Sequence, residues 1–231
     1  MSDIKKQMEK DDNTMKKFTL VTSFVEHNRI KHGQINQNTF LLNYFLKYNK
    51  YIIDNSEFYL INKTDRILNI DNANIIKVSN ILGHAEDKLK YKFNGCTADI
   101  LTGALISYQN GNDYVYIEPD TLVFNWNQEI QSGITFGRCF LCEVPSHTAC
   151  SFITITHDRL LDFINFFLNE PKTDMELMVE SKFFKLKQQT KCNEWQCEIQ
   201  DRDNKIGNKT EFFYRQHLLT HELNQIDEIM K

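Results

Sequence analysis

The stretch CSFITITHDRLLDFINFFLNEP (residues 150–171) joins a β-prone run to an amphipathic helix. Thr156 can cap the helix, Asp158 suits the positive end of its dipole, and Pro171 ends it. Apolar side chains form one wide face of this helix, at Leu160, Leu161, Ile164, Phe167 and Leu168. The stretch therefore predicts a strand over 150–156 and a helix over 157–169 that buries one side.

Further β-prone runs precede and follow this stretch, separated by Asn, Asp and Gly residues. We expect strands over 57–61, 66–70, 75–81, 89–93, 113–118, 121–126, 134–144, 175–187 and 194–200. Short runs at this spacing are typical of an antiparallel sheet or a barrel-like core.

Helical spacing recurs near both ends of the chain. Leu20, Val21, Phe24 and Val25 predict a first helix that ends near Gly33. A second helix is expected over 40–48, with Asn38 as its N-cap, and a last one over 211–230. Residues 97–108 fit a helical stripe that Gly103 weakens. The predicted fold class is α+β, with a mainly antiparallel β core, N-terminal helices, the helix near 157–169 and a C-terminal helix.

Composition and charge set the domain organisation. The chain of 231 residues is 41% hydrophobic and 25% charged, with a formal net charge of −4. We expect a polar, disordered tail over 1–16 and a single α+β domain over 17–231. The acidic balance argues against nucleic acid as a partner. No apolar run approaches the length of a membrane span. The charged start is unlike a signal peptide, which favours the cytoplasm and reduced cysteines.

One cysteine-rich cluster has the ligand set of a structural zinc site. Cys139, Cys142, His147 and Cys150 place three thiols and one imidazole within a short segment. On a strand, however, Cys139 and Cys142 would point to opposite faces. The alternative is that these residues are small apolar side chains of a buried hairpin. Packing is also the simpler interpretation of Cys192 and Cys197.

The segment Gly137-Arg138-Cys139, followed by a β-run that ends in His157, resembles the nucleophile region of viral chymotrypsin-like cysteine proteases. The resemblance implies Cys139 as a nucleophile and His157 as a specificity-pocket residue. That family follows its cysteine with two glycines, which allow the turn of the oxyanion hole. Phe140 and Leu141 stand there instead, and they are poorly suited to that backbone.

The strand, His157-Asp158 and the helix after them also resemble the poxin family of viral cyclic-dinucleotide nucleases. Members of that family use a His with a Tyr and a Lys four residues apart at a helix start, without a metal. Arg159 and Phe163 occupy the matching positions here. The resemblance therefore implies a β-rich scaffold without the catalytic pair.

The remaining polar patterns favour solvated surfaces. His217 and His221 share a helical face but lack the internal glutamate of a zinc-peptidase motif. Glu118 with Asp120, and a second pair at 201 and 203, are expected to be solvated turns without the spacing of a calcium loop.

By elimination, we expect a cytoplasmic protein that works by binding another protein and needs no cofactor. One alternative is a hydrolase with a Cys/His site, or a metal-independent phosphodiesterase, on a chymotrypsin-like β scaffold. The other is a small structural zinc-site protein.

Overall fold

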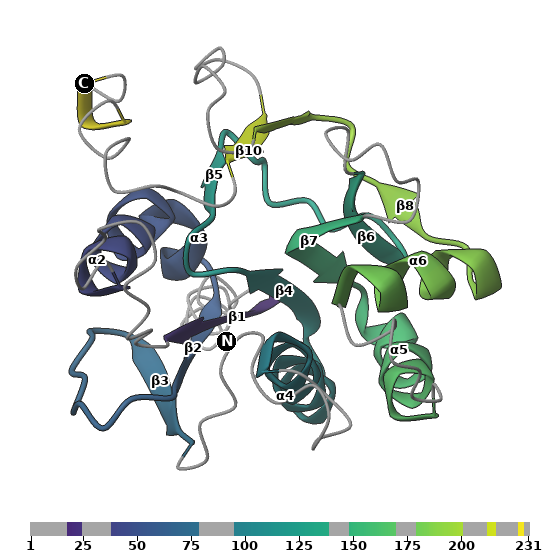
Figure 1. The fold of residues 1–231 in the computed structure, drawn as a ribbon, viewed down its shortest axis with the longest axis horizontal. Coiled ribbons are helices and arrows are strands. Elements are labelled where there is room, and N and C mark those ends of the chain that lie inside the picture. The colour runs from purple at the N-terminus through teal and green to yellow at the C-terminus, as the bar shows by residue number, and fades with distance from the viewer. Residues whose placement is uncertain are drawn as a thin grey trace, which may run out of the picture.

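The computed structural model describes residues 18–24, 38–78, 95–138, 148–169, 179–200, 212–215 and 226–228. In these ranges a seven-stranded sheet carries helices on both faces, and a three-stranded sheet lies beside it (Figure 1). The large sheet has the order β3-β2-β1-β4-β7-β6-β8. Its strands are β1 (Phe18–Phe24), β2 (Glu57–Asn62), β3 (Ala73–Lys77), β4 (Asp113–Ile117), β6 (Ile134–Arg138), β7 (Thr148–Ile155) and β8 (Asn193–Glu194). The small sheet joins β5 (Leu122–Phe124), β10 (Phe213–Arg215) and β9 (Glu198–Gln200).

The α+β class is confirmed, but the prediction of a mainly antiparallel core is wrong. Strand β1 runs parallel to both of its neighbours, β2 and β4, and β2 runs parallel to β3. The antiparallel pairs in the large sheet are β4 with β7 and β6 with β7. Parallel neighbours need a crossover between them, which helices α2 and α3 supply between β1 and β2, whereas residues 63–72 join β2 to β3 without a helix.

The predicted first helix is wrong over residues 18–24, which form β1, an interior strand whose residues are all buried; residues 25–33 lie outside the described ranges. A parallel strand that is covered on both faces need not alternate apolar and polar residues, and β1 does not. Over such a short length, its Leu20, Val21 and Phe24 also fit the spacing of one helical face. Periodicity therefore could not distinguish the two. The backbone carbonyl of Phe24, at the end of β1, accepts a hydrogen bond of 2.9 Å from the amide of Lys63.

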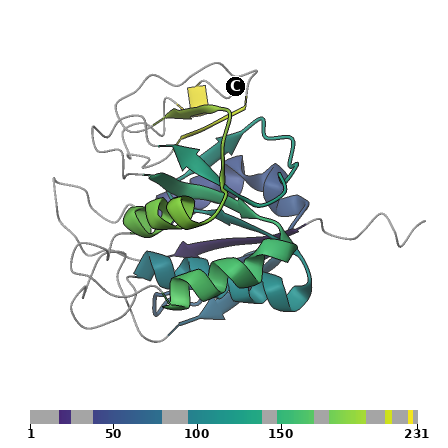
Figure 2. The same ribbon diagram turned by 90° about the vertical axis from the view of Figure 1, so that its right-hand side faces the viewer.

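Helices cover both faces of the large sheet (Figure 2), and a hydrophobic core lies on each face. Helices α2 (Asn38–Tyr48) and α3 (Lys50–Asp54) contribute Leu42, Phe45, Ile52 and Ile53 to one core. Helices α4 (Gly95–Asn110), α5 (His157–Asn169) and α6 (Val179–Gln189) cover the other. None of the helices in the described ranges is long and apolar enough to cross a membrane.

The helices predicted over 40–48 and 157–169 are confirmed as α2 and α5. The expected strand over 175–187 is wrong, because residues from 179 onward form α6. Phe183 and Leu186 lie one helical turn apart and both are buried, which favours a helix against the core. No strand forms over 66–70. The last helix is wrong over Phe213–Arg215, which form β10, whereas residues 226–228 are helical. The expected strand over 89–93 and the polar tail over 1–16 lie outside the described residues.

Candidate functional site

The carboxyl end of β4 carries an acidic turn, which we define as residues 118–121. The amide of Thr121 donates a hydrogen bond of 3.0 Å to the carbonyl of Glu118, which closes a β-turn. Pro119 stands at the second position of this turn, where its ring fixes φ at about −65°. The sequence thus holds Glu118 and Asp120 on a preorganised loop directly after a buried strand.

Glu118 is buried, with 5% of its surface exposed, so the expectation that it is solvated is wrong. Its amide donates a hydrogen bond of 2.8 Å to the carbonyl of Ser151 on β7. The thiol of Cys96, in the first turn of α4, donates to Glu118 Oε1 over 3.5 Å. Asp120 is more exposed than Glu118. The carboxylate of Glu118 is therefore held by the fold, whereas that of Asp120 is more accessible to solvent.

The thiol of Cys96 is held in its protonated form. Its burial, followed by the nearby charges of Glu118 and Asp99, raises the pKa of Cys96 well above its ordinary value of 9.0. A protonated thiol can donate a hydrogen bond to Glu118, but it is a poor nucleophile. Cys96 therefore supports the acidic turn rather than reacting.

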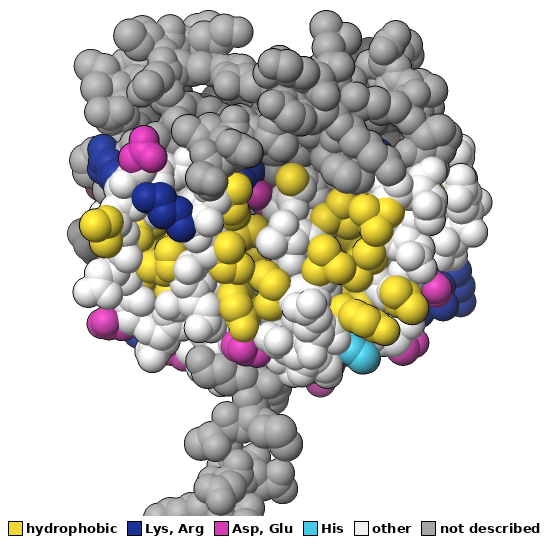
Figure 3. Space-filling model, turned by 90° about the horizontal axis from the view of Figure 1, so that it is seen from below, with side chains coloured by type: hydrophobic (Ala, Val, Ile, Leu, Met, Phe, Trp, Pro, Cys, Tyr) yellow, Lys and Arg dark blue, Asp and Glu magenta, His cyan; other side chains and the backbone are white. Residues whose placement is uncertain are grey.

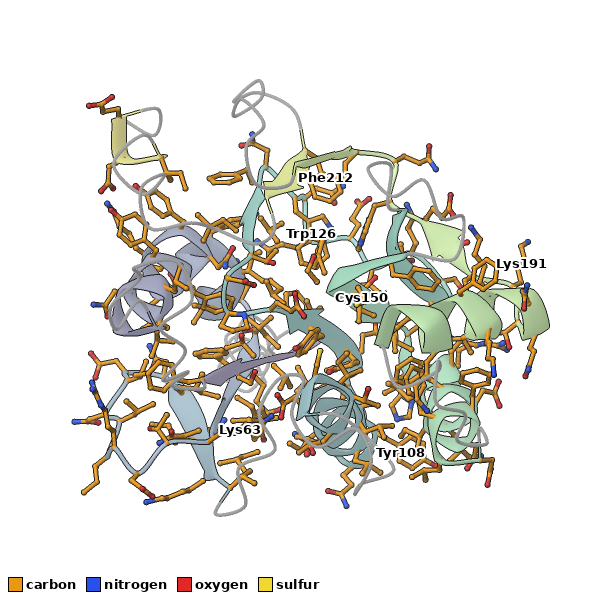
Figure 4. The ribbon with its side chains drawn as sticks, in the orientation of Figure 1. Lys63, Tyr108, Trp126, Cys150, Lys191 and Phe212 are labelled. Atoms are coloured by element: carbon orange, nitrogen blue, oxygen red, sulfur yellow. The ribbon has the colours of Figure 1, made fainter. Side chains whose placement is uncertain are left out.

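A buried ion pair lies on the face of the sheet that α4 covers. Lys63 Nζ is 2.6 Å from Asp99 Oδ2, and the two side chains are 3% and 5% exposed. Lys63 follows the end of β2 (Figure 4), and Asp99 lies in the first half of α4. The same carboxylate contributes to the raised pKa of Tyr116, although burial is the largest cause. The pair therefore joins β2 to the helix end that supports Glu118.

Hydrogen bonds next to Lys63 fix the chain where β2 ends. Asn62 Oδ1 accepts hydrogen bonds from the amide of Thr64 over 2.9 Å and from its hydroxyl over 2.8 Å. Asn62 Nδ2 donates to the carbonyl of Arg66 over 2.8 Å. This compact turn orients Lys63 toward α4 before any ligand binds.

The strand order places these groups at a topological switch point. From β1 the chain passes over one face through α2 and α3 to β2, and later crosses the other face through α4 to β4. In sheets wound on both faces, ligands bind outside the carboxyl ends of the strands where the order reverses. That position is the junction of β1 and β4, where the acidic turn begins.

A second feature is a pocket of about 260 Å³ on the opposite face of the sheet. The residues that line it come from the segment after β5, from the segment between β8 and β9, and from the residue before β10. It is lined by Asn125, Trp126, Asn127, Glu129, Gln131, Trp195, Gln196 and Phe212.

The aromatic rings of this pocket are packed against one another. Trp195 stacks on Phe152 with ring centroids 4.7 Å apart and an interplanar angle of 3°. Trp126 meets Phe152 edge-on at 5.1 Å, and Phe212 meets Trp195 edge-on at 5.5 Å. The indole N–H of Trp195 donates to the carbonyl of Phe152 over 3.0 Å. Figure 4 shows Trp126 and Phe212 close together, away from Lys63.

Most of the predicted cysteine cluster lies outside the described residues, namely Cys139, Cys142 and His147. Cys150 is described and is 5% exposed, on the β7 face that packs against the core of α4, α5 and α6. Within the described ranges, no three His, Cys, Asp or Glu side chains gather as a metal site. The zinc hypothesis therefore stays a prediction, because three of its four ligands are not described.

His157 begins α5 at the other end of the sheet from the acidic turn. Its amide donates a hydrogen bond of 2.7 Å to Asp113 Oδ1, where β4 starts. Its ring stacks on Tyr108 at 5.5 Å with an interplanar angle of 9°. The structure therefore does not bring His157 to Glu118. Its pairing with Cys139 stays a prediction, since Cys139 is not described.

The structure does not bring Cys192 and Cys197 together in one core. Cys192 packs against the core of α4, α5 and α6, whereas Cys197 packs against the opposite core. Burial raises the pKa of Cys192 to about 11. His217 and His221 lie outside the described residues.

Apolar side chains also gather on the surface formed by α4 and α5 (Figure 3). Leu105 and Tyr108 on α4 are 44% and 40% exposed. Leu161 and Leu168 on α5 are 47% and 41% exposed. We call these four residues the α4–α5 face.

No protein-family model matches the chain, and no curated protein matches it in sequence. The fold is similar to that of a solved glycosyltransferase involved in the glycosylation of the major capsid of PBCV-1. The two chains are 8% identical and have a TM-score of 0.51, over 92% of this chain and 98% of the other. At this low identity the likeness concerns the fold.

Proposed function

We propose that the protein is a glycosyltransferase that binds a nucleotide-sugar donor where β1 and β4 meet. The observation that carries this proposal is the acidic turn, which stands at the switch point of a sheet wound on both faces. Sheets of this kind bind nucleotides at that position. The similarity of the fold to a glycosyltransferase supports the choice of reaction.

Glu118 and Asp120 fit a divalent cation of the magnesium type. Such an ion prefers oxygen ligands and is commonly held by one or two carboxylates together with substrate phosphates. The carboxylates of Glu118 and Asp120, together with the phosphates of the donor, therefore supply enough oxygen ligands for such an ion. When bound, the cation would neutralise the negative charge that develops on the diphosphate as the sugar leaves.

The chain's own contribution is to hold the two carboxylates in place. Pro119 limits the backbone between them, and the Ser151 carbonyl and the Cys96 thiol fix Glu118. The Lys63–Asp99 pair keeps the start of α4 against the end of β2. A site that is rigid before binding loses less entropy when the donor arrives.

Calorimetric titration of the full chain with UDP-sugars and GDP-sugars, with and without Mn²⁺ or Mg²⁺, tests the proposal. We expect binding that depends on the cation. Asp120→Asn and Glu118→Gln should each lower the affinity at least tenfold, which corresponds to about 1.4 kcal/mol. Asp71→Asn, which changes an exposed carboxylate in the turn before β3, is the matched control and should bind as the unmodified chain does.

Circular dichroism of each variant distinguishes lost binding from lost folding. Asp120→Asn is the more informative variant, because Asp120 is less buried than Glu118. Failure of every nucleotide sugar to bind the unmodified chain, or equal binding by the folded Asp120→Asn variant, would overturn the proposal.

A protein-binding role is the second candidate, and the α4–α5 face favours it. Exposed apolar side chains that lie together commonly mark an interaction surface. If no nucleotide sugar binds, this face is where we would expect a protein partner to dock.

A further inference from the structure

The pocket beside β5 combines an aromatic floor with a polar rim. Trp126 and Trp195 are 3% and 5% exposed, so they form the floor. Asn127, Glu129 and Gln131 are exposed and stand around it. Ligand pockets usually pair an apolar lining with a few polar groups that fix the orientation of the ligand.

The polar groups of this rim suit a ligand with many hydroxyls and no charge. Amide side chains both donate and accept hydrogen bonds, and a carboxylate accepts them. Among its described lining residues there is no lysine or arginine, so these residues offer no cation to pair with a phosphate. A sugar ring has an apolar face that can rest on aromatic rings and hydroxyls that can reach the rim.

We propose that this pocket binds a neutral sugar residue of the acceptor glycan. The inference rests on the proposed glycosyltransferase function, because only then does the chain need a second carbohydrate site. The acidic turn suits the charged donor through a bound cation, whereas the rim offers amides and the Glu129 carboxylate, which suit the hydroxyls of a neutral acceptor. The two substrates would thus be distinguished by whether they carry a phosphate that a cation can bridge to the protein.

The pocket lies within reach of the acidic turn. Asn125 follows Asp120 by five residues, which span at most about 18 Å when fully extended. Neighbouring residues of β7 support both features: the Ser151 carbonyl holds the amide of Glu118, and the Phe152 carbonyl holds the indole of Trp195. An oligosaccharide that occupies the pocket could therefore extend toward the donor.

The aromatic floor is rigid before any ligand arrives. Trp126, Trp195 and Phe212 are fixed by stacked and edge-on contacts with one another or with Phe152. Such aromatic pairs add stabilisation beyond that of the area they bury. Little ordering of the floor is then required on binding, which favours affinity for a small ligand.

Intrinsic fluorescence tests the inference directly, because both tryptophans of the chain line this pocket. The full chain would be titrated with neutral oligosaccharides built from hexoses, deoxyhexoses, pentoses or N-acetylhexosamines. Glucose 6-phosphate serves as the charged probe. We expect a saturable change in emission with at least one neutral sugar and none with glucose 6-phosphate.

Substitutions on the exposed rim leave the aromatic floor intact. The double variant Glu129→Ala/Gln131→Ala should raise the dissociation constant for the neutral sugar at least fivefold. Gln188→Ala, which removes an exposed amide on α6, is the control and should leave that constant unchanged. No saturable change with any neutral sugar, or an unchanged constant in the folded double variant, would refute the inference.

The fluorescence assay separates this inference from the proposed function. Asp120→Asn should retain the sugar response while it loses binding of the nucleotide sugar. If the neutral sugar binds but no nucleotide sugar does, the pocket remains a carbohydrate site, but its assignment to an acceptor fails together with the transferase proposal.

Discussion

Replacing Lys63 by methionine should destabilise the protein strongly, because it removes the Lys63 cation from the buried Asp99 carboxylate. The two groups are 2.6 Å apart and their side chains are 3% and 5% exposed. Removing one member of such a pair costs about 3–5 kcal/mol. Total stabilities are commonly about 5–15 kcal/mol, so Lys63→Met would remove a large share.

Urea unfolding followed by circular dichroism measures this loss. With a slope of about 2–3 kcal/mol per M, the midpoint should fall by about 1–2.5 M. The double variant Lys63→Met/Asp99→Leu removes both charges and should regain most of the stability, since a well-packed apolar pair can replace a buried ion pair. A loss below about 1 kcal/mol for Lys63→Met would mean that water reaches Asp99, and it would refute the reasoning.

Two further predictions concern the packing of α4 on β4. Gly103→Ala should lower the stability by about 1–2 kcal/mol, because the added Cβ would lie 2.6 Å from the hydroxyl of the buried Tyr114. This clash outweighs the better helix propensity of alanine. Thermal denaturation should show a fall in Tm, and an unchanged or higher Tm would contradict this packing. Cys96 should resist iodoacetamide at pH 8 in the folded protein and react in urea, because burial raises its pKa well above 9.0. Its raised pKa also stabilises the fold below pH 9, and this contribution is lost as the pH rises further, since the unfolded thiol ionises first. Peptide mapping of the alkylated chain identifies Cys96, and rapid labelling of the folded protein would argue against its burial.

The sequence predicted elements well where one face is apolar and the other polar. Helix α5 has both the apolar stripe and the end signals, and its bounds were predicted correctly. Strand β1 has neither a polar face nor a boundary signal, because the sheet is covered on both sides. Its pairing with β4 joins Phe18 to Asp113, and nothing local in either segment specifies that partner or its parallel direction.

Most of the candidate site could not be predicted from the sequence, for a related reason. The sequence predicts Glu118 and Asp120 only as a solvated turn, because an acidic pair after a strand has the same composition whether it is buried or not. The signal that could have found them is the position of Glu118 and Pro119 directly after the buried end of β4, Tyr114–Ile117. Lys63 and Asp99 are separated by 36 residues, and their contact depends on the crossover through α4.

The parallel pairing of β1 also has a consequence during synthesis. Phe18 leaves the ribosome 95 residues before its partner Asp113 (113 − 18 = 95). At about 5–20 residues per second, β1 waits about 5–20 s for β4, one of its two neighbours. Thr19, Thr22 and Ser23 break its apolar run, so that only Leu20 and Val21 are adjacent apolar residues. Such interruptions lower the tendency of an exposed strand to aggregate.

In the folded sheet the hydroxyl of Thr22 has no hydrogen-bond partner among the described residues. The nascent chain gains solubility from a hydroxyl group whose burial costs the folded protein stability.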